Sequence, residues 1–303
     1  MKHYVCMDIG GTFIKHGLAD AEGNLLRKGS VATEIREKGV AAFLDSLQEI
    51  VEGYRDSFEA AGIAIASPGI VDAEKGEIVF VGNTFPGYTG TKLKEVMERR
   101  CGIPCEVEND VNAVGLGECW LGAGRGARSV VCMAVGTNIG GCIVLDGKLL
   151  HGAANSAGEL GFLDMGDGAK LEETSSTSAL VREIAQKRGV AASGLDGERI
   201  FADARAGKED AVRAIDGMVQ RIASALANVC CVLNPQRIVM GGGIMAQEEY
   251  LRPRLDAALR ERIQILPIRE STELVFAKFR NDAALLGALC HFLNSRSGGV
   301  SRG

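Results

Sequence analysis

The stretches VCMDIGGT, residues 5–12, and VCMAVGTNIGG, residues 131–141, are two versions of one pattern. Each is a short apolar run that ends in a glycine-rich turn and enters a second apolar run; a tight turn and a third run follow. Apolar runs bounded by turn residues are typical of β-strands, and a short Gly-containing turn between two runs is typical of a hairpin. Both halves therefore begin with the same strand–turn–strand–hairpin–strand unit, and this repetition predicts two domains of similar build.

Helical periodicity fills much of the remaining sequence. Short apolar runs at 237–240 and 274–279 predict two further strands. Because strands alternate with helices, an α/β fold is expected. The tail from Asn294 onward, rich in serine, glycine and arginine, is expected to fray. Helices are predicted over 40–58, 93–101, 211–233, 250–263 and 282–293.

The composition excludes several classes of protein. A formal charge of −5 over 303 residues argues against a general nucleic-acid binder, which would carry a basic face. No apolar stretch reaches the ~18 residues that a membrane span needs. The nine cysteines form no CxxC pair, and several lie in apolar runs, which is typical of buried residues in a reducing compartment. With no signal-peptide pattern ahead of the first strand, a cytoplasmic location is expected.

The glycine-rich turns are candidates for phosphate binding. Glycine lets backbone N–H groups point into a shared space that suits phosphate oxygens, and two such turns can clamp a triphosphate. Asp8 can hold Mg²⁺, directly or through a bound water, because that ion prefers hard oxygen ligands. Simple hairpin or strand-to-helix turns are the structural alternative. The candidate nucleotide and metal residues are Asp8, Gly10, Gly11, Thr12, Lys15, Gly136, Thr137, Gly241 and Gly242.

Four motifs occur in order along the chain: DIGGT at 8–12, ENDVNA at 108–113, the second glycine turn, and GGG at 241–243. In this order they resemble the signatures of the ROK family of bacterial sugar kinases and sugar-responsive repressors. The resemblance covers nearly the whole chain and implies duplicated actin-like ATPase (ribonuclease H-like) domains flanking a cleft. It also implies ATP and Mg²⁺ in that cleft, with a small sugar beneath them.

The domain boundaries follow from the same resemblance. We assign residues 1–110, completed by the C-terminal helix at 282–294, to an N-terminal α/β domain. Residues 111–281 form the C-terminal α/β domain.

Asn109 and Asp110 match the pair that binds the sugar and accepts its proton in this family. Phosphoryl transfer needs in-line positioning, a cation on the phosphates and an acceptor for the hydroxyl proton. An aspartate can be that general base, and an asparagine amide can hydrogen-bond to sugar hydroxyls. An Asx turn or a helix cap is the structural alternative for both residues. The resemblance implies Asp110 as the catalytic residue.

The segment AGELGF, residues 157–162, matches the family's Ala-Gly-Glu-x-Gly-His except at Phe162. In many relatives that histidine helps to bind a structural zinc together with a following cysteine cluster, and residues 164–171 contain no cysteine here. Such a site needs three thiolates and a histidine, so no zinc site is expected. Two of the sugar-binding candidates have a structural alternative: Asn83 as a turn residue and Glu172 as a solvated carboxylate. The resemblance implies that the sugar is bound by Gly69, Asn83, Asn109, Glu159 and Glu172.

An aromatic residue after the Glu-x-Gly segment is similar to the β-glucoside kinases of this family. The expected reaction is phosphorylation of a sugar hydroxyl, the 6-hydroxyl of a hexose or β-glucoside. Glucokinase and N-acetylmannosamine kinase activities stay open as alternative functions. Assembly as a homodimer is a separate open question. Seven residues precede Asp8, so the helix-turn-helix domain of the repressors is not expected. A sugar-sensing protein without catalysis is the remote alternative.

Overall fold

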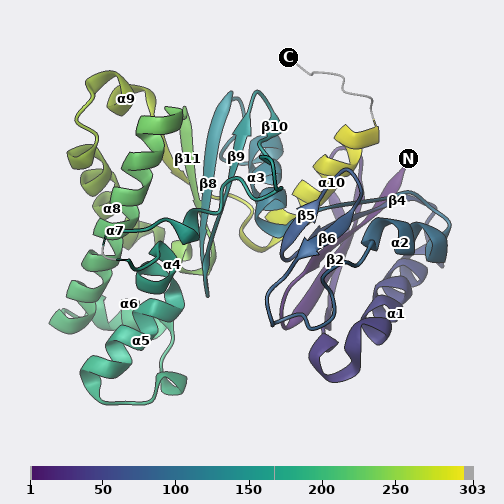
Figure 1. Ribbon diagram of the computed structural model, residues 1–303, viewed down its shortest axis with the longest axis horizontal. Helices are drawn as coiled ribbons and strands as arrows, with labels where there is room; N and C mark the ends of the chain where they lie inside the picture. Colours follow the sequence, from purple (N-terminus) through teal and green to yellow (C-terminus); the bar gives the residue numbers. More distant parts are fainter. Residues whose placement is uncertain (1, 167, 297–303) are drawn as a thin grey trace. The chain divides into compact units, whose positions relative to one another are not determined.

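The computed structural model describes residues 2–166 and 168–296, which form two units (Figure 1). The first unit contains the described residues up to Arg125, the segment 151–157, and those from Asn281 onward. The second contains 126–150 and the described residues of 158–280. The first unit thus continues past the boundary proposed at residue 110, and it also includes 151–157.

The first unit is built on a five-stranded sheet in the order β3-β2-β1-β4-β7. β1, β2 and β3 form an antiparallel meander, whereas β4 runs parallel to β1 and β7 parallel to β4. Two short strands, β5 and β6, form a separate antiparallel pair. The elements are β1 (His3–Ile9), β2 (Phe13–Asp20), β3 (Leu25–Ala32), α1 (Ile35–Arg55), β4 (Ala60–Ser67), β5 (Ile70–Asp72), β6 (Glu77–Phe80), α2 (Leu93–Cys101), β7 (Cys105–Asn109), α3 (Asp110–Leu121), η4 (Arg280–Asp282) and α10 (Ala283–Arg296).

Alternate residues of β1 supply the two faces of this sheet. Val5, Met7 and Ile9 belong to the core that includes buried residues of α1 and α2. Tyr4 and Cys6 belong to a second core formed with α3 and α10. In Figure 1, α1 and α10 lie on opposite sides of these strands. The period of two along the strand therefore produces a three-layer α/β/α unit.

The second unit repeats the same sheet order, as β10-β9-β8-β11-β12. β8, β9 and β10 form the meander, and β11 runs parallel to both β8 and β12. The long, amphipathic α7 contributes many residues to the core of this unit. The elements are β8 (Ser129–Val135), β9 (Ile139–Leu145), β10 (Lys148–Leu149), η1 (Leu160–Phe162), α4 (Leu171–Ser175), α5 (Thr177–Arg188), η2 (Ala192–Gly194), α6 (Gly197–Arg205), α7 (Glu209–Leu233), β11 (Arg237–Gly241), η3 (Gly243–Gln247), α8 (Glu248–Arg262), α9 (Leu266–Ser271) and β12 (Glu273–Phe276).

Two predictions on elements need correction. The helix predicted to begin at Val40 begins at Ile35, with a kink at Gly39, whose backbone is not helical. α10 continues to Arg296, so fraying does not begin at Asn294, and the rest of the tail lies outside the described residues. Within the described part of the chain, no helix combines the length and the apolarity that a membrane crossing requires.

Candidate active site

Predicted site residues gather at one edge of the first sheet. β1, β4 and β7 are parallel, so their carboxyl ends meet at the same edge, the usual ligand edge of α/β sheets. Asp8 is level with Ala66 on β4, which is level with Glu108 on β7. The chain leaves this edge towards the Gly10–Gly11 turn after β1 and Gly69 after β4, and enters α3 after β7. The fold thereby brings Asp8, Gly69, Asn109 and Asp110 to one edge.

Asn109 is the N-cap of α3. Its side-chain Oδ1 accepts hydrogen bonds from the N–H groups of Val111 at 2.9 Å and Asn112 at 3.0 Å. These two donors have no backbone carbonyl partner within the helix, and an Asn side chain in extended backbone is well suited to satisfy them. The cap is thus what the structure shows for Asn109.

Asp110 is the first residue of α3 and is held by its neighbours. Its Oδ1 accepts from Asn109 Nδ2 and from the N–H of Val111, each at 2.9 Å. Asn109 Nδ2 also donates to the carbonyl of Gly69 at 2.8 Å. The N-terminus of a helix stabilises negative charge, so this position suits a carboxylate. The side chain is half-buried.

Gly69 has to be glycine. Its φ of 92° lies in the left-handed region, and a Cβ there would stand 2.4 Å from the carbonyl oxygen of Phe80. The carbonyl of Gly69 is oriented to receive Asn109. Asn83, the other candidate from this part of the chain, is exposed in a turn after β6.

Asp8 lies near the end of β1 opposite Lys15 on β2. The side chain of Asp8 is 16% exposed, and its Oδ2 is 3.6 Å from Lys15 Nζ. Burial raises the pKa of the Asp8 carboxyl above its ordinary value, and the positive charge of Lys15 offsets part of this rise. A cation beside Asp8 would favour the ionised form, as expected of a magnesium ligand.

The first glycine turn is tight and partly exposed. The N–H of Gly10 donates to the carbonyl of Phe13 at 3.0 Å, and a Cβ on Gly10 would lie 2.9 Å from that oxygen. Thr33 fixes the turn from β3's end by donating its hydroxyl to the Gly10 carbonyl at 2.7 Å. Gly11 and Thr12 are exposed, and a Cβ on Gly11 would meet nothing within 4 Å. A turn of this kind fits an anion near its exposed tip.

The second unit contains the other candidate nucleotide residues. Gly136 and Thr137 form the turn between β8 and β9, and the Gly136 carbonyl accepts from the N–H of Thr177 at 2.8 Å. Thr137 is exposed. Gly241 ends β11, and Gly242 follows with a φ of 92°. A Cβ on Gly242 would stand 2.3 Å from the Val135 carbonyl oxygen. The packing of the end of β11 against β8 is therefore a sufficient reason for this glycine.

Glu159 and Glu172 lie close enough to interact. Partial burial raises the pKa of Glu159, and the negative charge of Glu172 raises it further. A Cβ on Gly161 would lie 3.1 Å from Glu172 Oε2, which places α4 against the segment that carries Glu159. Phe162 ends this segment with 54% of its surface exposed, and Lys170 Nζ is 4.6 Å from its ring centroid.

Three clustered residues next to the Asn109–Asp110 pair are not among the predicted site residues: Glu108, His151 and His291. Glu108 is buried at the end of β7, and its carboxylate contacts His151 at 2.8 Å and His291 at 3.6 Å. Glu108 occurs inside the ENDVNA motif, but the histidines are distant in sequence, and no local pattern links them to it.

The candidate residues supply part of the chemistry that is needed to hold Mg²⁺-ATP. Asp8 offers a hard oxygen, and Mg²⁺ normally needs only one or two carboxylates besides phosphates and water. Among the described residues no group of three or more His, Cys, Asp or Glu is arranged to hold a metal ion by itself.

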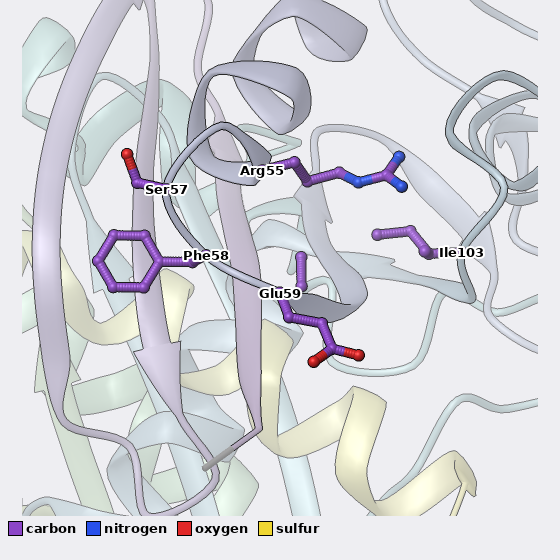
Figure 2. A pocket seen from close by; sticks show the side chains of 6 residues that line it. Arg55, Ser57, Phe58, Glu59 and Ile103 are labelled. Atoms are coloured by element: carbon purple, nitrogen blue, oxygen red, sulfur yellow. The ribbon is translucent and has the colours of Figure 1, made fainter.

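A surface hollow of about 490 Å³ lies away from these candidates. Figure 2 shows its lining by Arg55, Ser57, Phe58, Glu59 and Ile103. These residues precede β4 and β7, at the amino ends of the strands. None of them is a predicted site residue, and the hollow is no part of the candidate active site.

Comparisons with known proteins point to one family. A glucokinase of Thermotoga maritima is 32% identical over 316 residues, covering 97% of this chain and 98% of the relative. A β-glucoside kinase of Listeria monocytogenes is 31% identical over 297 residues, covering 96% of this chain and 97% of the relative. The crystal structure of a ROK family glucokinase from Streptomyces griseus, in complex with glucose and AMPPNP, has a TM-score of 0.81 and 27% identity; the match covers 95% of this chain and 98% of that chain.

These likenesses confirm the predicted α/β fold class with its repeated five-stranded sheet. A profile of the ROK family matches residues 4–294. The chain therefore belongs to the ROK family.

Proposed function

We propose that this chain is an ATP-dependent kinase that phosphorylates a hydroxyl of a small sugar, with Asp110 as the general base. The observation that carries the proposal is the start of α3. There Asn109 holds Asp110 at the same sheet edge as Asp8 and the Gly10–Gly11 turn. The relatives named as a glucokinase and a β-glucoside kinase support the same activity.

Proton transfer is the step that the chain's own residues perform. Asp110 accepts the proton of the sugar hydroxyl as its oxygen attacks the phosphoryl group. The hydrogen bonds from Asn109 and Val111 fix the direction of the carboxylate. The positive end of the α3 dipole stabilises the charged form before the proton arrives.

Mg²⁺-ATP supplies the phosphoryl group, and the metal neutralises the charge that develops on it. Asp8 would hold the Mg²⁺, directly or through a water. The turns at Gly10–Thr12 and Gly136–Thr137 would bind phosphate oxygens through their N–H groups, and Lys15 would add a positive charge. Gly241–Gly242 would lie against the base or the ribose.

The substrate sugar is proposed to be held by hydrogen bonds. Glu159 and Glu172 would accept hydrogen bonds from sugar hydroxyls. The raised pKa of Glu159 means that its charged form is disfavoured in the protein alone, and hydroxyl donors would stabilise that form. Asn109, the carbonyl of Gly69 and Asn83 are the remaining candidates.

We further propose a β-glucoside as the preferred substrate, because of Phe162. Burying a free anomeric hydroxyl against an aromatic ring without a partner costs about 1–3 kcal/mol. A glycosidic substituent that stacks on the ring instead gains about 25 cal/mol per Å² of buried apolar surface. Phe162 is 54% exposed and can offer such a surface. Glucose and N-acetylmannosamine are the alternatives.

The test is a kinetic comparison of glucose, N-acetylmannosamine and cellobiose with Mg²⁺-ATP, in the wild-type chain and in Phe162→His. The sugar phosphate is identified by ³¹P NMR. Wild type is expected to prefer cellobiose in kcat/KM, and Phe162→His is expected to shift the preference towards free sugars. Phe58→His is the matched control, because Phe58 precedes β4 at the opposite edge of the sheet. A hundredfold preference of wild type for glucose or N-acetylmannosamine over cellobiose would exclude the β-glucoside substrate but leave the kinase activity. Phosphorylation of no sugar would reject the proposed function.

Three features of the enzyme's setting complete the proposal. Mg²⁺ is the metal, the chain works in the cytoplasm, and it forms a homodimer. Light scattering that gives the mass of one chain at assay concentration would rule out the homodimer.

A further inference from the structure

Glu108 is a buried carboxylate at the residue before the Asn109–Asp110 pair. Its side chain is 0% exposed. A buried carboxylate is costly unless hydrogen bonds and an opposite charge compensate it. Its Oε1 accepts from the N–H of Asn109 at 2.8 Å and from Asn112 Nδ2 at 2.9 Å. Glu108 therefore braces the first turn of α3 from inside the protein.

His151 binds the other oxygen of this carboxylate. Its Nε2 is 2.8 Å from Glu108 Oε2. His151 begins the segment 151–157, whose last N–H, on Ala157, returns to the His151 carbonyl at 3.0 Å. The chain then continues directly into Gly158 and Glu159. The contact thus joins the start of α3 to the segment that leads to Glu159.

His291 on α10 is the third member of the cluster. Its Nδ1 is 3.6 Å from Glu108 Oε2, and its Nε2 is buried without a hydrogen-bond partner among the described residues. Burial lowers the pKa of His291, although Glu108 and Glu106 act in the opposite direction; His151 and Lys94 lower it further. Of the two histidines, His151 is therefore the candidate cation.

The charges around His151 favour its protonated form. The hydrogen bond that His151 donates to Glu108 is the largest influence and raises the pKa of His151, while burial opposes this. The charges of Glu108, Glu74 and Asp72 raise it further. Burial alone would raise the pKa of Glu108, but His151, His291 and Asn112 together hold it below its ordinary value.

We propose that Glu108 and His151 form a latch that positions Asp110 for proton transfer and loosens when His151 loses its proton. The inference rests on the proposed role of Asp110 as the base. Glu108 and His151 are positioning residues, since they act on Asp110 through Asn109 and the first turn of α3. Neutral His151 still donates a hydrogen bond through Nε2–H, so deprotonation weakens the latch rather than breaking it.

The signs define a pH window. The folded-state pKa of His151 is raised, so the charged latch is complete below it and is lost as the pH rises through it. The folded-state pKa of Glu108 is lowered, so the latch fails on the acid side only as the pH falls through that value. The latch therefore produces an alkaline limb in kcat/KM, with a midpoint above the ordinary histidine pKa of about 6.5.

The kinetic test compares pH profiles of wild type, Glu108→Gln, His151→Gln and the control His3→Gln. Wild type is expected to lose about fivefold in kcat/KM across the alkaline limb, because a charge-assisted hydrogen bond is roughly twice as strong as a neutral one. His151→Gln keeps a neutral donor, so its profile is expected to lack this limb. Glu108→Gln is expected to lower kcat roughly 10–100-fold, with a smaller change in KM, because misplacing a reacting group is costly. His3→Gln is expected to keep the wild-type profile. An alkaline limb of unchanged midpoint in His151→Gln would overturn the proposal.

NMR provides a readout that does not depend on turnover. The chain has four histidines, so the ring signals are assignable by substitution. The backbone N–H signals of Asn109, Val111 and Asn112 are expected to titrate with the midpoint of His151, and Glu108→Gln is expected to lower that midpoint. If wild type phosphorylates no sugar, the proposed function fails and these signals still decide whether the latch exists. Amide signals that ignore the His151 titration would reject the latch even in an active kinase.

Discussion

Asn109 makes four hydrogen bonds with its side chain within the protein. Its Oδ1 accepts from two N–H groups of α3, and its Nδ2 donates to the Gly69 carbonyl and to Asp110. The sequence alone left an Asx cap and a sugar ligand as two interpretations of this residue. The geometry shows the cap, and it shows how that cap fixes Asp110. Orientation of Asp110, the proposed base, is thus a physical reason for an asparagine at this position.

Replacing Asn109 separates its two roles. Asn109→Ala removes the cap and should lower the free energy of unfolding by about 1 kcal/mol. Asn109→Ser keeps a capping oxygen, so its loss of stability should be smaller. Both variants lose the bond from Nδ2 to Asp110, so kcat should fall more than KM rises. Urea denaturation and steady-state kinetics measure these effects, and an Asn109→Ala protein of wild-type stability would show that the cap contributes nothing.

At the scale of elements, the glycine turns predicted the three-stranded meander of each sheet. The strand–turn–strand–hairpin–strand units that begin at residues 5 and 131 correspond to β1–β3 and β8–β10. A tight turn places its two flanking apolar runs side by side, so that they pair. β4 was missed because its sequence, AAGIAIAS, is buried on both faces and so lacks the alternation typical of an exposed strand. α3 was missed because glycines interrupt its apolar pattern.

Glycines on both helices let α3 and α10 approach closely. A Cβ on Gly287 of α10 would lie 1.6 Å from the carbonyl oxygen of Ala113 on α3. Gly117 of α3 faces the Ala283 carbonyl of α10 in the same way, where a Cβ would stand at 2.4 Å. The contact explains why α10 packs beside the first sheet although it is last in the sequence.

Gly287→Ala should therefore destabilise the chain. Overpacking of a tight contact typically costs about 1–3 kcal/mol, because the helices must move apart. Gly53→Ala on α1 is the matched control, since a Cβ there meets nothing within 4 Å and alanine favours the helix by roughly 1 kcal/mol. Thermal unfolding should show a lower Tm for Gly287→Ala and an equal or higher Tm for Gly53→Ala. Equal melting of Gly287→Ala and wild type would argue against this close approach.

At the scale of the whole molecule, the order of the motifs along the chain was sufficient to predict the family. Contacts between residues that are distant in sequence were not predictable. Glu108 and His151 are 43 positions apart, and their contact depends on how the segment 151–157 folds back within the first unit. Hydrophobic periodicity carries no information on such a pair. The same limit applies to the boundary proposed at residue 110, because the packing of α3 against α10, β4 and β7 keeps α3 with the first unit.

We expect the kinase reaction to depend on the Asp110 carboxylate, and one substitution tests this dependence. Turnover and sugar binding are measured in Asp110→Asn, with exposed Asp56→Asn at the end of α1 as the control. Asparagine keeps the shape and the acceptor oxygen of Asp110 but cannot take up a proton at neutral pH. In Asp110→Asn, kcat is expected to fall by about 10²–10⁴-fold. The sugar is still expected to raise the Tm of this variant, and Asp56→Asn is expected to behave as wild type. Turnover by Asp110→Asn within threefold of wild type would show that Asp110 is not the general base.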